Sequence, residues 1–314
     1  MSAVREHHES LRASVRRGLE KLALEQDLSD STPIPPEREL MERFDVSRGT
    51  LRSAIGDLVS AGLLRTEQGR GTYVNKEAQA RLLVWDRLAD VARPDSRFHD
   101  DYRQFVPDFV GRDACDEAVQ NLAAWKNAAT VFIAPDNSLG GLRLLALEQG
   151  KRVLVPTYGL RRGFVLLEAD LIPPEQRPLA ATLDGMESLG TCVGVAAVPE
   201  FIDGVDLMVS GAVAVTTQGI HIGSESRYLA VELAVLTQLE LVSHRTPLIV
   251  TAHDCQVLEV DMELSTVSCV ASTVVTPTRV LHCGAHTGRA RTVSRTDERR
   301  VLRLVNAAID EEVS

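Results

Sequence analysis

The sequence lacks the features of exported, membrane-spanning and disulfide-rich proteins. Its 314 residues contain no apolar run of membrane-spanning length, and residues 1–10 are polar rather than a signal peptide. It has five cysteines, an odd number, scattered and without a CxxC pair. This pattern argues against a disulfide framework and for free thiols in a reducing compartment. We therefore expect a cytoplasmic protein without membrane contact.

A net positive charge is lacking as well, since the formal net charge is −10. The acidic excess lies entirely in one part of the chain. Residues 1–76 hold 12 basic and 12 acidic residues, whereas residues 77–314 hold 22 basic and 32 acidic residues. An acidic second part repels nucleic acid and suits a small ligand or a protein partner. The length allows about two domains, and the 44% hydrophobic content supports a core in each.

Residues 34–74 predict a winged helix-turn-helix. A short helix over residues 36–44 is followed by a turn, and Ser47 is placed to cap a second helix. Gly62 suits the left-handed residue that ends this second helix. Two short strands then flank a glycine-containing tip at residues 69–71. The apolar stripes of the two helices are Leu40, Met41 and Phe44, and Leu51, Ile55, Leu58 and Val59.

The polar residues of this segment fit DNA recognition. Arg48 and Arg52 lie at the N-terminal end of the second helix, away from its apolar stripe, as contacts with guanine edges and phosphates require. Gly69 and Gly71 allow the tip backbone to approach a narrow groove, with Arg70 between them. The alternative is a solvated helical hairpin whose arginines only maintain solubility.

Nearly every position from residue 34 to 74 resembles the winged helix-turn-helix of GntR-type bacterial regulators. The resemblance implies double-stranded operator DNA as a partner. Pro36 stands where the family usually has a capping serine, so we expect a weaker cap and an intact helix. By resemblance, the DNA contacts are Arg38, Arg48 and Arg52 on phosphates and bases, Thr50 on the backbone, and Gly69, Arg70, Gly71 and Thr72 in the wing.

From about residue 99 the sequence alternates short apolar strands with helices. Such runs predict an α/β domain whose mostly parallel sheet is covered on both faces, with ligands at the carboxyl ends of its strands. The predicted strands are residues 130–134, 152–155, 206–215, 247–251 and 273–276, and the predicted helices include 139–150 and 228–241.

The pattern divides the chain into four parts. Residues 1–76 form the winged helix-turn-helix domain, which begins with an amphipathic helix over residues 5–26. Residues 77–98 form a connector helix, with the first helix of the next domain as the alternative, and residues 99–288 form the α/β effector domain. Residues 289–314 form an arginine-rich C-terminal helix, which is a solvated tail, an auxiliary DNA contact or a dimer helix.

A second, ordered set of motifs covers residues 82–283. Together the motifs resemble the 5-formyltetrahydrofolate cyclo-ligase family, in particular its methenyltetrahydrofolate-synthetase-like branch. The resemblance implies a three-layer α/β fold related to ribose-phosphate isomerases and CoA-transferases. Active members close the formyl-folate ring with ATP and magnesium, and hold phosphates in a glycine-rich loop. The motifs lie at residues 107–111, 135–151, 155–164, 219–232, 253–254 and 275–280.

The chain departs from this family at the phosphate loop. Glu225 and Arg227 stand where glycines are expected, and Ser224 stands where a basic or aromatic residue is expected. A side chain at positive φ is strained, and Glu225 places negative charge against phosphate. We therefore expect no ligation, no catalytic residue, no metal site and no required cofactor. A nucleotide, ATP-magnesium or folate-like ligand remains open. The candidate ligand-binding residues are Pro156, Arg161, Phe164, Gly223, Glu225, Arg227, Tyr228, Glu232, His253 and Asp254.

Several of these side chains have a structural alternative. Arg143 and Lys151 either join Arg161 around an anionic ligand or are surface residues. Glu232 is either a pocket residue or a solvated helix residue. His253 and Asp254 either bind the ligand or form a turn in which Asp254 caps the next segment. A zinc site built from His282, Cys283, His286 and Cys269 lacks a second clean ligand pair.

The sequence thus predicts a homodimeric transcription factor, since one such module contacts too little DNA for useful selectivity. A small-molecule effector bound in the acidic α/β domain controls it. One alternative is an active ATP-dependent cyclo-ligase, or a related folate- or thiamin-linked enzyme, fused to a DNA-binding domain. Another is an α/β domain that serves only oligomerisation, its pocket closed by Glu225 and Arg227.

Overall fold

The computed structural model describes residues 11–95, 105–223, 228–260, 262 and 269–283. It divides into two compact units, and the division falls between Leu83 and Val84, inside helix α4 (Lys76–Leu88). Residues 5–10 of the predicted first helix, the predicted helix over residues 289–314, and Glu225, Arg227 and His286 lie outside the described residues.

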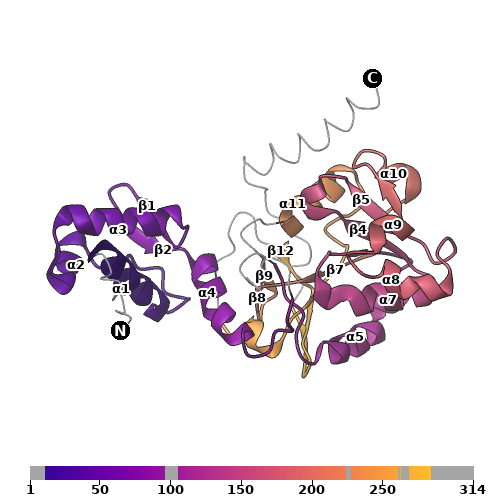
Figure 1. Cartoon of the computed structure of the whole chain (residues 1–314), viewed down its shortest axis with the longest axis horizontal. Helices are drawn as coiled ribbons and strands as arrows, with labels where there is room; N and C mark the ends of the chain where they lie inside the picture. Colours follow the sequence, from indigo (N-terminus) through magenta and orange to yellow (C-terminus); the bar gives the residue numbers. More distant parts are fainter. Residues whose placement is uncertain (1–10, 96–104, 224–227, 261, 263–268, 284–314) are drawn as a thin grey trace, which may run out of the picture. The chain divides into compact units, whose positions relative to one another are not determined.

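Within its described residues, the first unit contains helices α1 to α3, the first part of α4 and a two-stranded wing (Figure 1). Leu19, Leu40, Leu51 and Leu58 are buried in its core. Val59, predicted to belong to the apolar stripe, is 38% exposed, and Ala54 is buried in its place. The burial follows the spacing of one helical face, so the stripe was placed partly on the wrong side. The elements are α1 (Leu11–Glu25), α2 (Glu37–Phe44), α3 (Arg48–Ser60), β1 (Leu64–Glu67) and β2 (Gly71–Val74).

Local interactions explain where these helices begin and end. The side-chain oxygen of Ser47 accepts a hydrogen bond of 3.2 Å from the backbone N–H of Thr50, which confirms the predicted cap. Gly62 follows α3 at φ 75°, as a left-handed helix end requires. Pro36 makes no side-chain cap bond, yet α2 forms, as predicted.

The second unit is built on an eight-stranded sheet of order β14-β13-β10-β7-β3-β4-β5-β6. The strands from β13 to β4 are parallel, and β14, β5 and β6 pair antiparallel, so the mostly parallel sheet is confirmed. Every residue of β3, β5, β7 and β10 is buried, as in a sheet covered on both faces. The strands are β3 (Thr130–Ile133), β4 (Arg152–Pro156), β5 (Phe164–Leu167), β6 (Thr191–Val193), β7 (Leu207–Gly211), β10 (Leu248–Thr251), β13 (Thr273–Val275) and β14 (Val280–His282).

A smaller sheet of order β11-β8-β9-β12 completes the strands. The predicted single strand over residues 206–215 is therefore wrong: β7 ends at Gly211 in the large sheet, and β8 begins at Ala214 in the small sheet. The smaller sheet consists of β8 (Ala214–Thr216), β9 (Ile220–Ile222), β11 (Val257–Leu258) and β12 (Cys269–Val270).

Helices pack on the large sheet around a continuous apolar core that includes Trp125 and Phe132. No helix among the described residues is long and apolar enough to cross a membrane. The helices of this unit are α5 (Arg112–Asn121), α6 (Ala123–Asn127), α7 (Gly140–Glu148), α8 (Arg177–Ala180), α9 (Met186–Leu189), α10 (Val198–Phe201) and α11 (Tyr228–Gln238), with 3-10 turns at Asn137–Leu139, Tyr158–Leu160, Pro174–Gln176 and Asp254–Gln256.

Candidate functional site

The predicted recognition helix presents two arginines one turn apart. The side chains of Arg48 and Arg52 on α3 are 65% and 58% exposed. Both pair with Glu37, the first residue of α2: Arg48 Nε lies 2.9 Å from Oε2, and Arg52 Nε lies 2.8 Å from Oε1. These hydrogen bonds, the one from Arg52 first, lower the pKa of Glu37. Sequence reasoning missed Glu37, because its partners are 11 and 15 residues away.

The other predicted DNA contacts lie on the same unit. Arg38 is exposed on α2. Thr50 is half-buried, and its hydroxyl lies 3.0 Å from that of Ser47. In the wing, the carbonyl oxygen of Thr72 accepts a 2.8 Å hydrogen bond from the N–H of Ile34.

The wing tip is a three-residue turn between β1 and β2. Gly69 and Gly71 have φ values of 75° and 133°, which favour glycine, and Arg70 is exposed between them. Glu67 at the end of β1 pairs with Arg65 and also with Arg70, whose Nη1 lies 3.6 Å from Oε2. The wing therefore repeats the arrangement around Glu37, with one carboxylate between two arginines.

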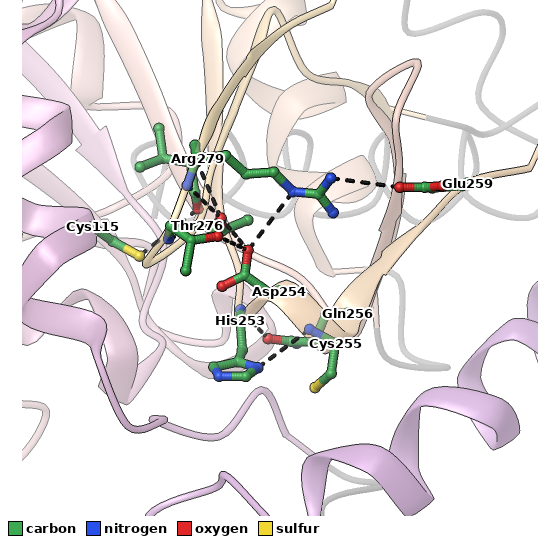
Figure 2. Close-up of polar contacts among 10 residues, drawn as sticks. Cys115, His253, Asp254, Cys255, Gln256, Glu259, Thr276 and Arg279 are labelled. Carbon is green, nitrogen blue, oxygen red and sulfur yellow. Dashed lines mark hydrogen bonds and ion pairs between the residues drawn. The ribbon is translucent and has the colours of Figure 1, made fainter.

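At the carboxyl edge of the large sheet, the loop after β10 is fixed by hydrogen bonds (Figure 2). His253 Nδ1 accepts from the N–H of Cys255 at 3.2 Å, and the Gln256 side chain accepts from the N–H of His253 at 2.6 Å. The capping residue of this turn is therefore His253, and not Asp254 as the turn alternative had it. Gln256 Nε2 also donates to the carbonyl oxygens of Ala212 at 2.6 Å and Val213 at 3.1 Å, where β7 gives way to β8.

Asp254 joins this loop to the segment after β13 (Figure 2). Its Oδ1 accepts hydrogen bonds of 2.6 Å from the hydroxyls of both Thr276 and Thr278, and lies 3.7 Å from Nε of Arg279. The ring of Phe109 meets the ring of His253 edge-on, with centroids 5.8 Å apart. The structure thus brings together motifs that are more than 140 residues apart in the sequence.

A second group lies around the loop after β4. The rings of Tyr158 and Tyr228 are 5.2 Å apart, and the Arg161 guanidinium carbon lies 5.9 Å from the Tyr158 ring centre. Tyr158 is 54% exposed, and its hydrogen bond with Tyr228 raises its pKa from the usual 10. Arg161 and Tyr228, both predicted ligand residues, therefore meet through a tyrosine that the sequence did not single out.

The remaining predicted ligand residues are less exposed. Pro156 ends β4 and is buried, and Phe164 begins β5 and is fully buried in the hydrophobic core. Glu232 on α11 is 3% exposed, so the alternative of a solvated helix residue is wrong. Gly223 follows β9 and is the last described residue before the gap at residues 224–227.

Arg143 and Lys151 are buried, which excludes the surface alternative. Arg143 donates to the carbonyl oxygens of Ala181 (2.7 Å), Ala134 (2.8 Å) and Asp136 (3.2 Å). Lys151 Nζ donates to two backbone carbonyls at 2.7 and 2.9 Å, and burial lowers its pKa. Both cations donate to backbone oxygens, and the alternative in which they also meet an anionic ligand stays a prediction.

Three carboxylates surround one arginine at the start of α5. Arg112 pairs with Asp108, Asp113 and Asp116, and its Nη1 lies 2.7 Å from Asp116. Burial first, then the negative charges of Asp113 and Asp108, raise the pKa of Asp116 to about 7 and outweigh Arg112. The sequence signal was the spacing Asp-x-x-x-Arg-Asp-x-x-Asp, in which Arg112 and Asp116 lie one helical turn apart on α5 and Asp108 precedes the helix.

An open, polar hollow of about 610 Å³ lies at the other edge of the sheet. It is lined by Thr130, Arg152 and Asp206, among others, which stand where β3, β4 and β7 begin. We predicted a ligand pocket at the carboxyl ends of these strands, so the hollow is not at the predicted place.

Of the weak zinc motif, His286 lies outside the described residues and His282 is exposed at the end of β14, so only the two cysteines have described surroundings. The thiol of Cys283 lies 3.6 Å from the carbonyl oxygen of Thr217, and Cys269 is buried in β12. Within the part of the chain that the structure describes, no group of three or more His, Cys, Asp or Glu side chains is placed to hold a metal ion.

A winged helix-turn-helix followed by a mostly parallel α/β sheet defines the class of this protein. The chain belongs to the 5-formyltetrahydrofolate cyclo-ligase family, whose family model matches residues 78–267. Residues 11–74 match the model of bacterial regulatory proteins of the gntR family. The protein therefore carries a GntR winged helix-turn-helix fused to a cyclo-ligase-like domain.

Individual relatives match one part each. A methenyltetrahydrofolate synthase domain-containing protein of Homo sapiens is 34% identical over 226 residues, covering 68% of this chain and 55% of that protein. The HTH-type transcriptional repressor NagR of Bacillus subtilis (strain 168) is 37% identical over 75 residues, covering 24% of this chain and 28% of that protein. The crystal structure of AraR(DBD) in complex with operator ORR3 is 40% identical, with a TM-score of 0.22, and covers 24% of this chain and 90% of that one. The chain spans about half the length of the curated synthase-domain relatives it matches.

Proposed function

We propose that this protein is a DNA-binding transcription regulator whose operator affinity is set by a small molecule bound in its cyclo-ligase-like domain. The observation that carries the proposal is the pair Arg48 and Arg52. Both side chains are exposed, one turn apart, at the capped N-terminal end of α3. This end of a recognition helix is the part that contacts base edges in the major groove.

The remaining contacts follow from the same docking. Arg38 and Thr50 contact phosphates and the backbone, while Arg70 and its flanking glycines enter the minor groove with Thr72 alongside. A homodimer on paired half-sites supplies the selectivity that one module lacks. The named relatives support the proposed DNA binding, since NagR is a transcriptional repressor and AraR(DBD) was crystallised with an operator.

The effector binds at the carboxyl edge of the large sheet. Arg161 with Tyr158 and Tyr228 supplies a cation beside two aromatic rings, which suits a flat, anionic molecule. Helix α4 runs from one compact unit into the other, so we assign it the role of connecting lever. A ligand that binds two dimer arrangements with different affinity changes operator affinity, commonly by about 1–3 kcal/mol.

Residual cyclo-ligase activity is the rival function, favoured by the family match over residues 78–267. Oδ1 of Asp254 accepts from two hydroxyls and faces Arg279. These protein donors already occupy Oδ1 of Asp254, so this carboxylate does not fit the role of a magnesium ligand. Conversion of 5-formyltetrahydrofolate by the purified full chain with ATP, measured by absorbance, would favour the rival.

Selection of DNA from a random duplex library by the full-length protein tests the proposal. We expect enrichment of a two-fold symmetric sequence. Arg48→Ala should weaken binding to it by about 1–3 kcal/mol and relax the preference at one base position, because a bidentate base contact is lost. Lys21→Ala removes the same charge from α1 and serves as the matched control. No enrichment by the wild-type protein would overturn the proposal.

The same selected duplex tests the effector role. Operator affinity is measured with and without a folate, a nucleotide and a thiamin-type pyrimidine, each in turn. A change with one class that Arg161→Met abolishes supports the assignment. If a ligand binds the protein and operator affinity stays the same, control by that ligand is excluded.

A further inference from the structure

Glu37 occupies an unusual position between the two arginines of the recognition helix. Its two carboxylate oxygens are used separately, one for Arg48 and one for Arg52. Both arginines donate through Nε, at 2.9 and 2.8 Å. Glu37 lies on α2 and the arginines lie on α3, so the contact depends on the packing of the two helices.

The use of Nε determines which part of each guanidinium faces outward. A guanidinium carries five N–H donors, four of them on the terminal nitrogens Nη1 and Nη2. A carboxylate bound at Nε holds the side chain from one edge and leaves the Nη1–Nη2 end for other acceptors. Arginine reads guanine by donating two hydrogen bonds to O6 and N7, which this end can supply. The pairing therefore fixes two flexible side chains in a geometry suited to bases.

The same carboxylate weakens contacts that carry no sequence information. Binding to any DNA rests largely on cations that neutralise phosphates. Glu37 places one negative charge between two of the four arginines that the proposed interface relies on, and Glu67 is placed similarly beside Arg70. The negative charge of these carboxylates repels a phosphate at the Nη1–Nη2 end, whereas an uncharged base edge at the same end is not repelled. The even balance of 12 basic and 12 acidic residues in residues 1–76 agrees with this arrangement.

We infer that Glu37 is a specificity-determining positioning residue: it holds Arg48 and Arg52 for end-on contact with base edges and suppresses their sequence-independent contact with phosphates. This inference rests on the proposed DNA-binding function.

The test compares Glu37→Gln with Glu39→Gln in the full-length protein. Glutamine at position 37 accepts hydrogen bonds through its one side-chain oxygen only, and its NH2 group is a donor that cannot replace the second carboxylate oxygen. Glu39 lies in the same first turn of α2, is exposed, and makes no ion pair in the described structure, so Glu39→Gln is a control for charge and helix position. The probes are the duplex selected from a random library by the wild-type protein and a scrambled duplex of equal length.

We expect Glu37→Gln to bind the scrambled duplex more tightly, by several-fold, and to bind the selected duplex no better than wild type. The ratio of the two affinities should fall roughly tenfold, about the value of one good base contact. Glu39→Gln should leave the ratio within about twofold of wild type. A merely structural role for Glu37 would lower both affinities together, and thermal unfolding of both variants records any loss of stability.

Equal ratios for Glu37→Gln and Glu39→Gln, with a selective wild type, would overturn the inference and leave the proposed function standing. A wild-type protein that binds both duplexes equally would instead refute the proposed function. A parallel fall in both affinities would also overturn the inference.

Discussion

Substitution of Arg143 tests whether this buried cation stabilises the cyclo-ligase-like domain through its hydrogen bonds to backbone carbonyls. Its guanidinium is 1% exposed and donates to three backbone carbonyls in two separate segments, around Ala134 and Asp136 and at Ala181. Arg143→Met keeps the apolar stem and removes every donor. The buried carbonyls of Ala134 and Ala181, and the half-buried carbonyl of Asp136, would then lose a charged donor.

The magnitude follows from the cost of such losses. Each hydrogen bond to a charged group contributes about 1.5–3 kcal/mol, and an unpaired buried group costs about 1–3 kcal/mol. These terms are not additive, so we expect a loss of about 3–5 kcal/mol in the free energy of unfolding of the second unit. A domain has a total of roughly 5–15 kcal/mol, so the variant should unfold at a much lower urea concentration.

Tryptophan fluorescence in urea is the appropriate assay, because both tryptophans, Trp85 and Trp125, belong to the second unit. Arg161→Met is the matched control, since Arg161 is an exposed arginine of the same unit and should change the midpoint little. If Arg143→Met unfolds at the wild-type urea concentration, the structural role assigned to Arg143 is refuted.

Two further predictions concern titration and helix capping. The pKa of Asp116, about 7 when folded, lies above its ordinary 3.8, so the folded state binds the extra proton. Stability should therefore fall as pH rises from about 4 to 7, by up to about 4 kcal/mol, and Asp116→Asn should flatten this slope in urea titrations; an unchanged slope would contradict the pKa shift. Ser47→Ala should cost the first unit about 1 kcal/mol and Ser47→Gly only a few tenths, measured by circular dichroism; equal losses would argue against the side-chain cap.

Local signals predicted the DNA-binding unit well. The Ser47 cap, the helix end at Gly62 and the weak start at Pro36 each depend on interactions within a few residues. The prediction that Val59 is buried was wrong, because apolar residues extend around much of this helix. The sequence alone does not show which of its sides faces the neighbouring helices. Glu37 was missed for a related reason, since its partners come from the next helix.

In the α/β unit, the predictions that were wrong concern features fixed by contacts between residues far apart in the sequence. The apolar run at residues 206–215 is continuous in sequence, but the structure divides it, and the carbonyls of Ala212 and Val213 at the break are held by Gln256, more than 40 residues away. Arg143 and Lys151 were predicted to be either ligand contacts or surface residues. Their burial depends on backbone carbonyls from other segments, which no local pattern encodes.

Charge and motif order predicted the site only in outline. The sequence placed His253, Asp254 and residues 275–280 at one edge of the sheet, and the structure brings them together. The direction of capping at His253 and the contact between Tyr158 and Tyr228 depend on side-chain orientations that the sequence does not specify.

The most direct measurement is a titration of the full-length protein on DNA taken from upstream of its own gene, with a random-sequence competitor present. We expect a discrete complex that survives a large excess of competitor, because specific binding exceeds random binding by about a thousandfold or more. Loss of the complex at an equal mass of competitor, for DNA throughout that region, would contradict it.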